Sequence, residues 1–194
     1  MSDSDSAAGG LGRDVSGVAA EPAPISDALV AAIRDQYRLD WRGIHGVVHW
    51  ARVLENGLAL APETGARADV VTLFALLHDA CRHNDRHDPE HGPRAAAFAR
   101  RLHADGLFAL DAAGLDLLTA ACHGHTHDET HPDATVQTCY DADRLDLARC
   151  GITPDPRYLC TDAARRPERI AWAIERSVTC HEPDVAARWM AGRG

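Results

Sequence analysis

Histidine and aspartate gather in one part of this chain. Eleven of the twelve histidines lie between His45 and His131, and aspartates are interleaved with them. Imidazole nitrogen and carboxylate oxygen together suit zinc, iron and manganese, and a site without thiolate ligands usually serves hydrolysis or oxygen chemistry. The residue types therefore predict a metal centre in this region.

One histidine–aspartate pair closes a long apolar run. In LFALLHDACRHND, residues 73–85, an uncharged stretch ends in His78 and Asp79. On a helix of 3.6 residues per turn these neighbours point about 100° apart, so both reach one ion only when other segments complete the shell. His49 and Asp143 are the best candidates for that role, because each lies in an amphipathic segment where a polar group would otherwise interrupt the buried face.

The segments that must position these residues are predicted to be helical. Ser26 is typical of the N-cap of a helix, here over residues 27–38, and residues 41–61 carry apolar side chains at helical spacing. Pro62 and Gly65 are expected to end that second helix.

The next helix is expected at the centre of a bundle. Residues 66–80 are apolar on nearly every side, as in a buried helix. No alternating segment rich in Val and Ile predicts a strand, so the expected fold class is all-α, a single compact helical bundle over residues 25–194. Residues 1–24, mostly Ser, Asp, Ala, Gly and Pro, are expected to form a disordered arm. Further helices are predicted over residues 89–106, 112–122, 139–151 and 167–180, and after Pro183.

The composition limits the class of ligand. With 194 residues the chain fits one domain, and 20 basic against 29 acidic residues give a net charge of −9, which opposes binding to a nucleic-acid backbone. No apolar stretch approaches the roughly 20 residues of a membrane helix. All 20 basic residues are arginine, which excludes lysine-based chemistry such as a Schiff base. A small ligand is therefore expected, with no long nucleic acid and no membrane as a partner.

The cysteines and the N-terminal residues indicate the cellular compartment of the protein. Six are scattered without a C-x-x-C pair, and the N-terminus lacks the basic and apolar regions of a signal peptide. Both features favour a cytoplasmic protein with reduced thiols. The cysteines are expected to be buried small hydrophobic residues, although Cys81 and Cys122 lie near candidate metal ligands in the sequence.

Three short segments together resemble a known family. HWARV at 49–53, HDACR at 78–82 and DADRLD at 141–146 are similar to the three signatures of the HD-domain superfamily of metal-dependent phosphohydrolases, in their usual order. The resemblance covers about residues 44–149. It implies one divalent ion, which could be manganese, magnesium, iron, nickel, cobalt or zinc. The implied ligands are His49, His78, Asp79 and Asp143.

Some members of that superfamily hold a second metal ion through two more histidines between the pair and the last aspartate. His91 and His125 fit those positions here, and with Asp79 they are also the candidates for catalysis. His91 follows Asp79 by only 12 residues, so one ion is the expectation and two ions the alternative. His123 and His127 compete with His125, which is favoured by its distance from the preceding helix.

The resemblance also implies an activity. A metal-activated water would hydrolyse a phosphoester in a small, nucleotide-like molecule. The acid that protonates the leaving oxygen could be His91, His125, Asp85 or Asp88, and the sequence does not choose among them.

Substrate-binding residues are sought among the arginines, because a phosphate favours planar bidentate donors. The alternative for each arginine is an ion pair on a charged rim with a neighbouring acidic residue. His45, one helical turn before His49, is expected to orient His49 or to bind substrate. The four candidate arginines are Arg82, Arg86, Arg94 and Arg144.

Two other functions are compatible with the same residues. A mixed-ligand di-iron oxygenase, a chemistry of some members of the superfamily, requires both His91 and His125 as ligands. A non-catalytic ligand sensor is less favoured, because it has no need to keep the ligands of all three segments. Separately, the amphipathic segment 168–190 contains Trp172 and Trp189, which belong either to the core or to the contact surface of a homodimer.

Overall fold

The computed structural model describes residues 22–191, and every regular element in that range is a helix. The predicted arm lies outside the described residues except for 22–24, where Ala23 packs against the core. None of the described helices combines the length and the apolar character that a membrane span needs. The elements in chain order are α1 (Asp27–Gln36), α2 (Val47–Thr64), α3 (Ala68–Leu77), α4 (His91–Ala104), α5 (Ala112–Gly124), α6 (Ala134–Arg144), the 3₁₀ helices η1 (Leu147–Cys150) and η2 (Pro156–Tyr158), α7 (Asp162–Arg165), α8 (Pro167–Val178) and α9 (Asp184–Ala191).

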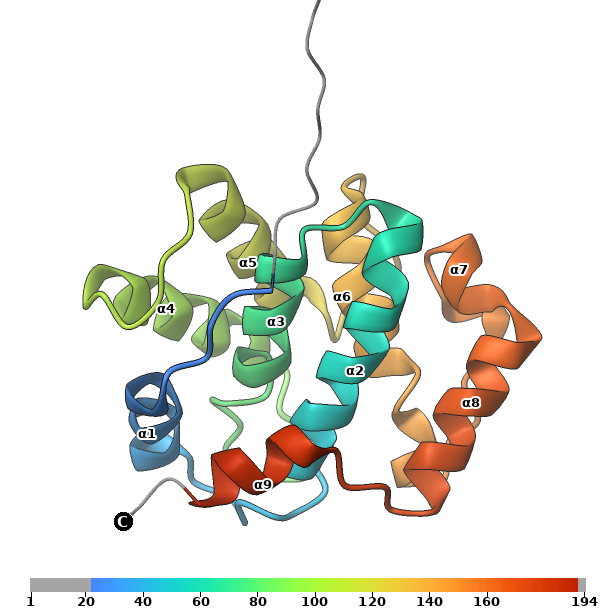
Figure 1. Ribbon diagram of the computed structural model, residues 1–194, viewed down its shortest axis with the longest axis horizontal. Coiled ribbons are helices and arrows are strands. Elements are labelled where there is room, and N and C mark those ends of the chain that lie inside the picture. The colour runs from blue at the N-terminus through green and yellow to red at the C-terminus, as the bar shows by residue number, and fades with distance from the viewer. Residues whose placement is uncertain (1–21, 192–194) are drawn as a thin grey trace, which may run out of the picture.

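Helix α3 lies at the centre of the bundle, as its apolar sequence predicts (Figure 1). All residues from Val70 to Leu77 are buried, and α3 packs against α2, α4, α5 and α6. The next two residues, His78 and Asp79, are consequently buried as well. The central helix therefore carries the predicted ligand pair into the core.

Helix α2 differs from its predicted bounds at both ends. Residues 41–46 form turns, because two glycines in this stretch disfavour a helix, and α2 begins at Val47. His49 therefore lies in its first turn. Pro62 lies inside the last turn instead of ending the helix, and Gly65 ends it with a φ of 72°, a left-handed conformation that favours glycine.

The segment around Asp143 also differs from the prediction of one helix over residues 139–151. Helix α6 starts earlier, at Ala134, because the carboxylate of Asp133 caps it by accepting a hydrogen bond from Thr135 N. It ends at Arg144, and η1 follows as a separate element. Asp143 therefore lies in the last turn of α6. The short elements η2 and α7 have no counterpart in the prediction.

Helices α8 and α9 both pack against α2 (Figure 1). Trp189 of α9 is buried in the main core. Trp172 of α8 is half-buried against a second, smaller core that includes Leu60 and Leu145. Both tryptophans thus pack within the chain, in agreement with the core interpretation, and the homodimer stays a prediction.

All six cysteines are free thiols. Three are buried, as expected: Cys81, Cys122 and Cys139. Cys160 is half-buried. The expectation of burial is wrong for Cys150 and Cys180, which are exposed because they lie at the end of η1 and in the turn after α8.

Candidate metal centre

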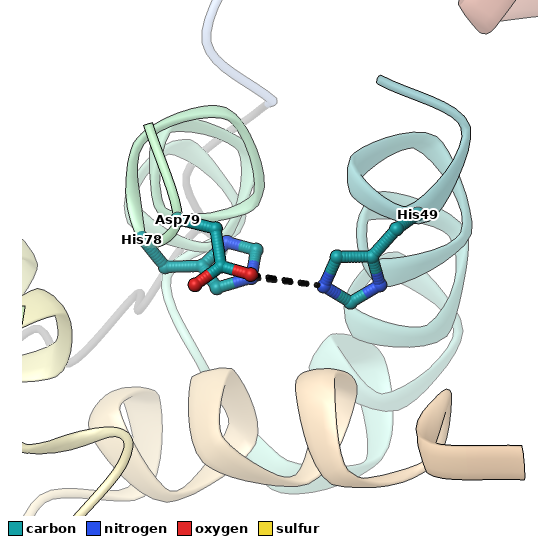
Figure 2. Close-up of side chains that lie close together, drawn as sticks. All are labelled: His49, His78 and Asp79. Atoms are coloured by element: carbon teal, nitrogen blue, oxygen red, sulfur yellow. Dashed lines mark hydrogen bonds and ion pairs between the residues drawn. The ribbon is translucent and has the colours of Figure 1, made fainter. Parts of the chain in front are cut away.

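Four side chains from three helices converge in the core. His49 comes from α2, the pair His78 and Asp79 from the end of α3, and Asp143 from α6. The Nε2 atoms of His49 and His78 are 3.1 Å apart, and Asp79 Oδ2 lies 3.7 Å from each of them. Asp143 Oδ1 lies 3.3 Å from His49 Nε2 and 3.8 Å from His78 Nε2. Figure 2 shows His49 of α2 pointing toward the pair at the end of α3. We call these four residues the first ligand group.

The end of α3 explains how two neighbouring residues reach one point. The helix ends at Leu77, His78 is its C-cap, and residues 79–81 continue as turns. His78 still has a helical backbone conformation, with φ −54° and ψ −44°, so the two side chains diverge as they do on a helix, and His49 Nε2 is near enough to meet both, 3.1 Å from His78 Nε2 and 3.7 Å from Asp79 Oδ2. Both side chains can therefore face His49.

Asp79 also belongs to a second group. Its other carboxylate oxygen, Oδ1, lies 3.2 Å from His91 Nε2 and 3.8 Å from His125 Nε2, and these two nitrogens are 2.9 Å apart. His91 is the first residue of α4, and His125 directly follows α5. The competing candidates His123 and His127 are exposed. We call Asp79, His91 and His125 the second ligand group.

A close approach of α4 to α5 brings the two histidines of the second group together. A Cβ atom on Gly92 would lie 2.7 Å from the carbonyl oxygens of both Cys122 and His123. Because glycine has no Cβ atom, the start of α4 can pack this closely against the end of α5. This contact places His91 beside His125.

The four central histidines all turn the same ring nitrogen inward. In each ring Nδ1–H donates to an oxygen, which leaves a lone pair on Nε2 for a metal. The acceptors are backbone carbonyl oxygens for His78, His91 and His125 and a carboxylate oxygen of Asp146 for His49. As a result, two pairs of Nε2 lone pairs face each other at 3.1 and 2.9 Å. Facing acceptors at such distances require a shared cation, either a metal ion or a proton.

The carboxylates supply the negative charge of a cation site. Asp143 Oδ1 is buried and has no hydrogen-bond donor among the described residues. Burial would raise the pKa of Asp79 and of Asp143, but the neighbouring histidines hold both pKa values well below the usual range. Burial lowers the pKa of His78 to about 3, so this imidazole is neutral and keeps its lone pair. Nitrogen and carboxylate donors in this arrangement fit a divalent ion such as manganese, iron, cobalt, nickel or zinc.

Sequence reasoning misses a buried carboxylate behind His49. Asp146 Oδ2 accepts a hydrogen bond from His49 Nδ1 at 2.7 Å, and Asp146 Oδ1 accepts from Arg52 Nε at 2.7 Å and from Ser177 Oγ. Burial would raise the pKa of Asp146, but His49 and Arg52 lower it to about 2. The available signal is its position three residues after Asp143 in DADRLD, a spacing that places helical side chains on one face.

Two arginines reach the ligand groups. Arg82 Nη1 lies 3.3 Å from Asp79 Oδ1 and 3.1 Å from His91 Nε2. Arg149, which sequence reasoning also misses, lies on η1 with its Nη2 4.0 Å from Asp143 Oδ1. Both guanidinium groups are placed where they can meet an anionic ligand of the centre.

Three other residues that the sequence suggests for substrate binding lie in different surroundings. Arg94 Nη2 pairs with both carboxylate oxygens of Asp88, at 2.7 and 2.6 Å, as the charged-rim alternative predicts. Arg86 is exposed on the loop before α4. His45 Nδ1 lies 2.8 Å from Asp85 Oδ1, and burial is the main cause that lowers the pKa of His45.

Arg144 lines a cavity of about 450 Å³. Its guanidinium donates to the carbonyl oxygens of Glu129 and Tyr158, both at 2.8 Å, and so joins two walls of the cavity. Thr126 lines the same cavity, and its hydroxyl lies 3.1 Å from His91 Nε2. Thr126 therefore lies between the cavity and the second ligand group, whose own residues do not line it, and the cavity is large enough for a small ligand.

The fold is shared with a solved protein. No protein-family model and no curated protein matches this sequence. The structure is similar to the crystal structure of a protein from an uncultured Thermotogales bacterium that is described as a predicted HD superfamily hydrolase. The two share 22% sequence identity with a TM-score of 0.60, and the match covers 88% of this chain and 94% of that chain. The chain thus shares its all-helical fold with that protein, and its own buried histidine–aspartate centre includes residues of the three short segments.

Proposed function

We propose that this protein is a metal-dependent phosphohydrolase that cleaves a small, nucleotide-like phosphomonoester or phosphodiester. One observation carries the proposal: the ring nitrogens of His49 and His78 lie within 3.8 Å of carboxylate oxygens of Asp79 and Asp143, although these residues are far apart in the sequence. The description of the similar Thermotogales protein as a hydrolase supports the same class. These four residues would hold a divalent ion, which would supply a water nucleophile at neutral pH and neutralise charge on a phosphoryl oxygen.

The surroundings of the ligands suit an anionic substrate. Arg82 and Arg149 bring guanidinium groups to the two carboxylates of the centre, where they can also donate to phosphoryl oxygens. The cavity beside Thr126 can receive the non-reacting part of the substrate. A net charge of −9 makes a small phosphoester a better substrate than a long nucleic acid.

His125 is the general acid of this proposal. Burial, the largest single influence, would lower its pKa, but the neighbouring carboxylates of Asp79 and Asp143 together raise it. His125 therefore holds a proton that can pass to the leaving oxygen. Two other candidate acids already have partners: Asp85 Oδ1 lies 2.8 Å from His45 Nδ1, and Asp88 is held in an ion pair with Arg94.

A substrate panel tests the proposal. The protein is incubated with Mn²⁺, Mg²⁺, Co²⁺ or Ni²⁺ and with nucleoside monophosphates, cyclic nucleotides and an aryl phosphodiester. We expect hydrolysis that depends on the ion, stops on chelation and is lost in His49→Ala. The exposed His123→Ala is the matched control and should keep wild-type activity. No turnover in the whole panel, with metal demonstrably bound, would refute the function, and nucleotide binding without turnover would favour a sensor.

The second ligand group supports one other candidate function. A di-iron oxygenase would use His91 and His125 in addition to the first ligand group, and both are buried beside Asp79. Metal analysis of aerobically purified protein separates the two functions. Two irons per chain with a visible charge-transfer band would favour the oxygenase, whereas one manganese, nickel or magnesium would favour the hydrolase.

A further inference from the structure

The guanidinium of Arg82 occupies part of the second ligand group. Its Nη1 lies 3.1 Å from His91 Nε2 and 3.3 Å from Asp79 Oδ1, two of the three ligand atoms of that group. The side chain is only 10% exposed, and its other terminal nitrogen donates to the carbonyl oxygen of Arg86 at 2.9 Å. The guanidinium is therefore held on both sides inside the protein.

The two ligand groups differ in how closely a guanidinium approaches their ligand atoms. In the first group Asp143 Oδ1 is buried without a hydrogen-bond donor among the described residues, and the guanidinium of Arg149 stands 4.0 Å away. In the second group Arg82 already lies within hydrogen-bond distance of two ligand atoms. Arginine stays charged at physiological pH. A divalent ion entering the second group would have to displace this charge or lie beside it against Coulomb repulsion.

The loop between α3 and α4 supports this contact. His91 Nδ1–H donates to Asp88 O, so His91 Nε2 presents its lone pair to Arg82. The ion pair of Arg94 with the carboxylate of Asp88 fixes the same loop. The short segment that follows Asp79 thus contains both His91 of the second ligand group and Arg82, which faces it.

We propose that Arg82 is the built-in second cation of this centre, so that the chain binds one divalent ion in the first ligand group and none in the second. The inference rests on the proposed metal site. Asp79 would then bind the ion with Oδ2 and accept a hydrogen bond from the guanidinium of Arg82 with Oδ1. His91 and His125 hold the arginine and a proton instead of a metal, and the di-iron alternative is disfavoured as long as Arg82 stays in place.

Metal stoichiometry tests this inference. The wild-type chain and its variants are saturated with Mn²⁺ and desalted, and bound manganese is quantified per chain. We expect one ion in the wild type, two in Arg82→Met, and one in the double variant Arg82→Met/His91→Ala, which lacks a ligand of the second group. Arg86→Met removes an exposed arginine from the same loop and should bind one ion. Two ions in the wild type, or one in Arg82→Met, would overturn the proposal.

A measurement on the wild type alone does not depend on the folding of variants. At saturating Mn²⁺, electron paramagnetic resonance should show the spectrum of an isolated ion. Two ions that share Asp79 would give an exchange-coupled spectrum and refute the proposal. Failure of the proposed function is distinguishable, because one bound manganese without hydrolysis of any phosphoester would leave the role of Arg82 intact. A wild type that binds no manganese would refute both.

Discussion

His49 Nδ1 lies 2.7 Å from Asp146 Oδ2, in a buried network that Arg52 and Ser177 complete. The Nδ1 atoms of the other three central histidines meet backbone carbonyl oxygens, which carry only partial charge. A full carboxylate fixes the orientation of an imidazole and makes its other nitrogen a stronger ligand. Of the two histidines of the first ligand group, His49 is therefore the one whose ring is oriented by a full negative charge.

Replacing Asp146 should weaken metal binding without removing a ligand. In Asp146→Asn an amide NH₂ would face one of the donors that surround this side chain, either Arg52 or His49. We expect the affinity for Mn²⁺ to fall by about 10- to 100-fold, measured by isothermal titration calorimetry. Ser177→Ala removes a hydroxyl from the same carboxylate but keeps its contact with His49, and should retain wild-type affinity. An unchanged affinity in Asp146→Asn would argue against this orienting role.

The same carboxylate predicts how the stability of the metal-free protein depends on pH. An unfolded aspartate has a pKa of about 3.9. In the folded chain burial would raise the pKa of Asp146, but His49 and Arg52 lower it to about 2. Because the folded pKa is depressed, the stabilisation is fully present above the unfolded pKa and is lost as the pH falls from about 4 toward 2.

Urea unfolding in the presence of a chelator measures this effect. The difference in unfolding free energy between the wild type and Asp146→Asn should be constant above about pH 5 and should shrink by on the order of 2 kcal/mol as the pH approaches 2. A difference that does not change with pH would show that the pKa of Asp146 is not depressed.

The ligands of the first group could be predicted because each interrupts an apolar pattern. His78 and Asp79 follow the buried run Val70–Leu77, and a polar pair at that place needs partners, since burying it alone is costly. His49 and Asp143 are conspicuous for the same reason. Helix periodicity likewise sufficed for the central helix and for the all-α class.

The partners of Arg144 could not be predicted, because a long side chain reaches acceptors that are distant in the sequence, whereas Arg94 pairs with the nearby Asp88 as the charged-rim alternative predicts. Arg144 donates to the carbonyl oxygens of Glu129, in the loop between α5 and α6, and of Tyr158, the last residue of η2. The role of Asp146 could not be predicted for a related reason. Its role depends on where α6 ends and on Arg52, a residue of α2, and neither follows from the local pattern.

Metal binding should stabilise the fold through the first ligand group. An ion that binds only the native state stabilises it by about 2.7 kcal/mol at a free concentration a hundredfold above its Kd. We expect Mn²⁺ to raise the unfolding free energy of the wild type by about this amount. Asp143→Ala should show little of this increase, because it removes a ligand. The exposed His127→Ala is the control and should behave as the wild type does. Full stabilisation of Asp143→Ala by Mn²⁺ would place the ion elsewhere.

The contact of α4 with α5 predicts the effect of one added methyl group at Gly92. That methyl group would lie 2.7 Å from two backbone carbonyl oxygens, which cannot rotate away as a side chain can. Gly92→Ala should therefore lower the unfolding free energy by about 1–3 kcal/mol, although alanine is the better helix former. Since α4 must move away from α5, His91 should separate from His125 and phosphoester hydrolysis should slow as well. Ala97→Ser, on the exposed face of the same helix, should change the unfolding free energy by less than about 0.5 kcal/mol. A Gly92→Ala protein with the stability and activity of the wild type would show that the two histidines do not depend on this close approach.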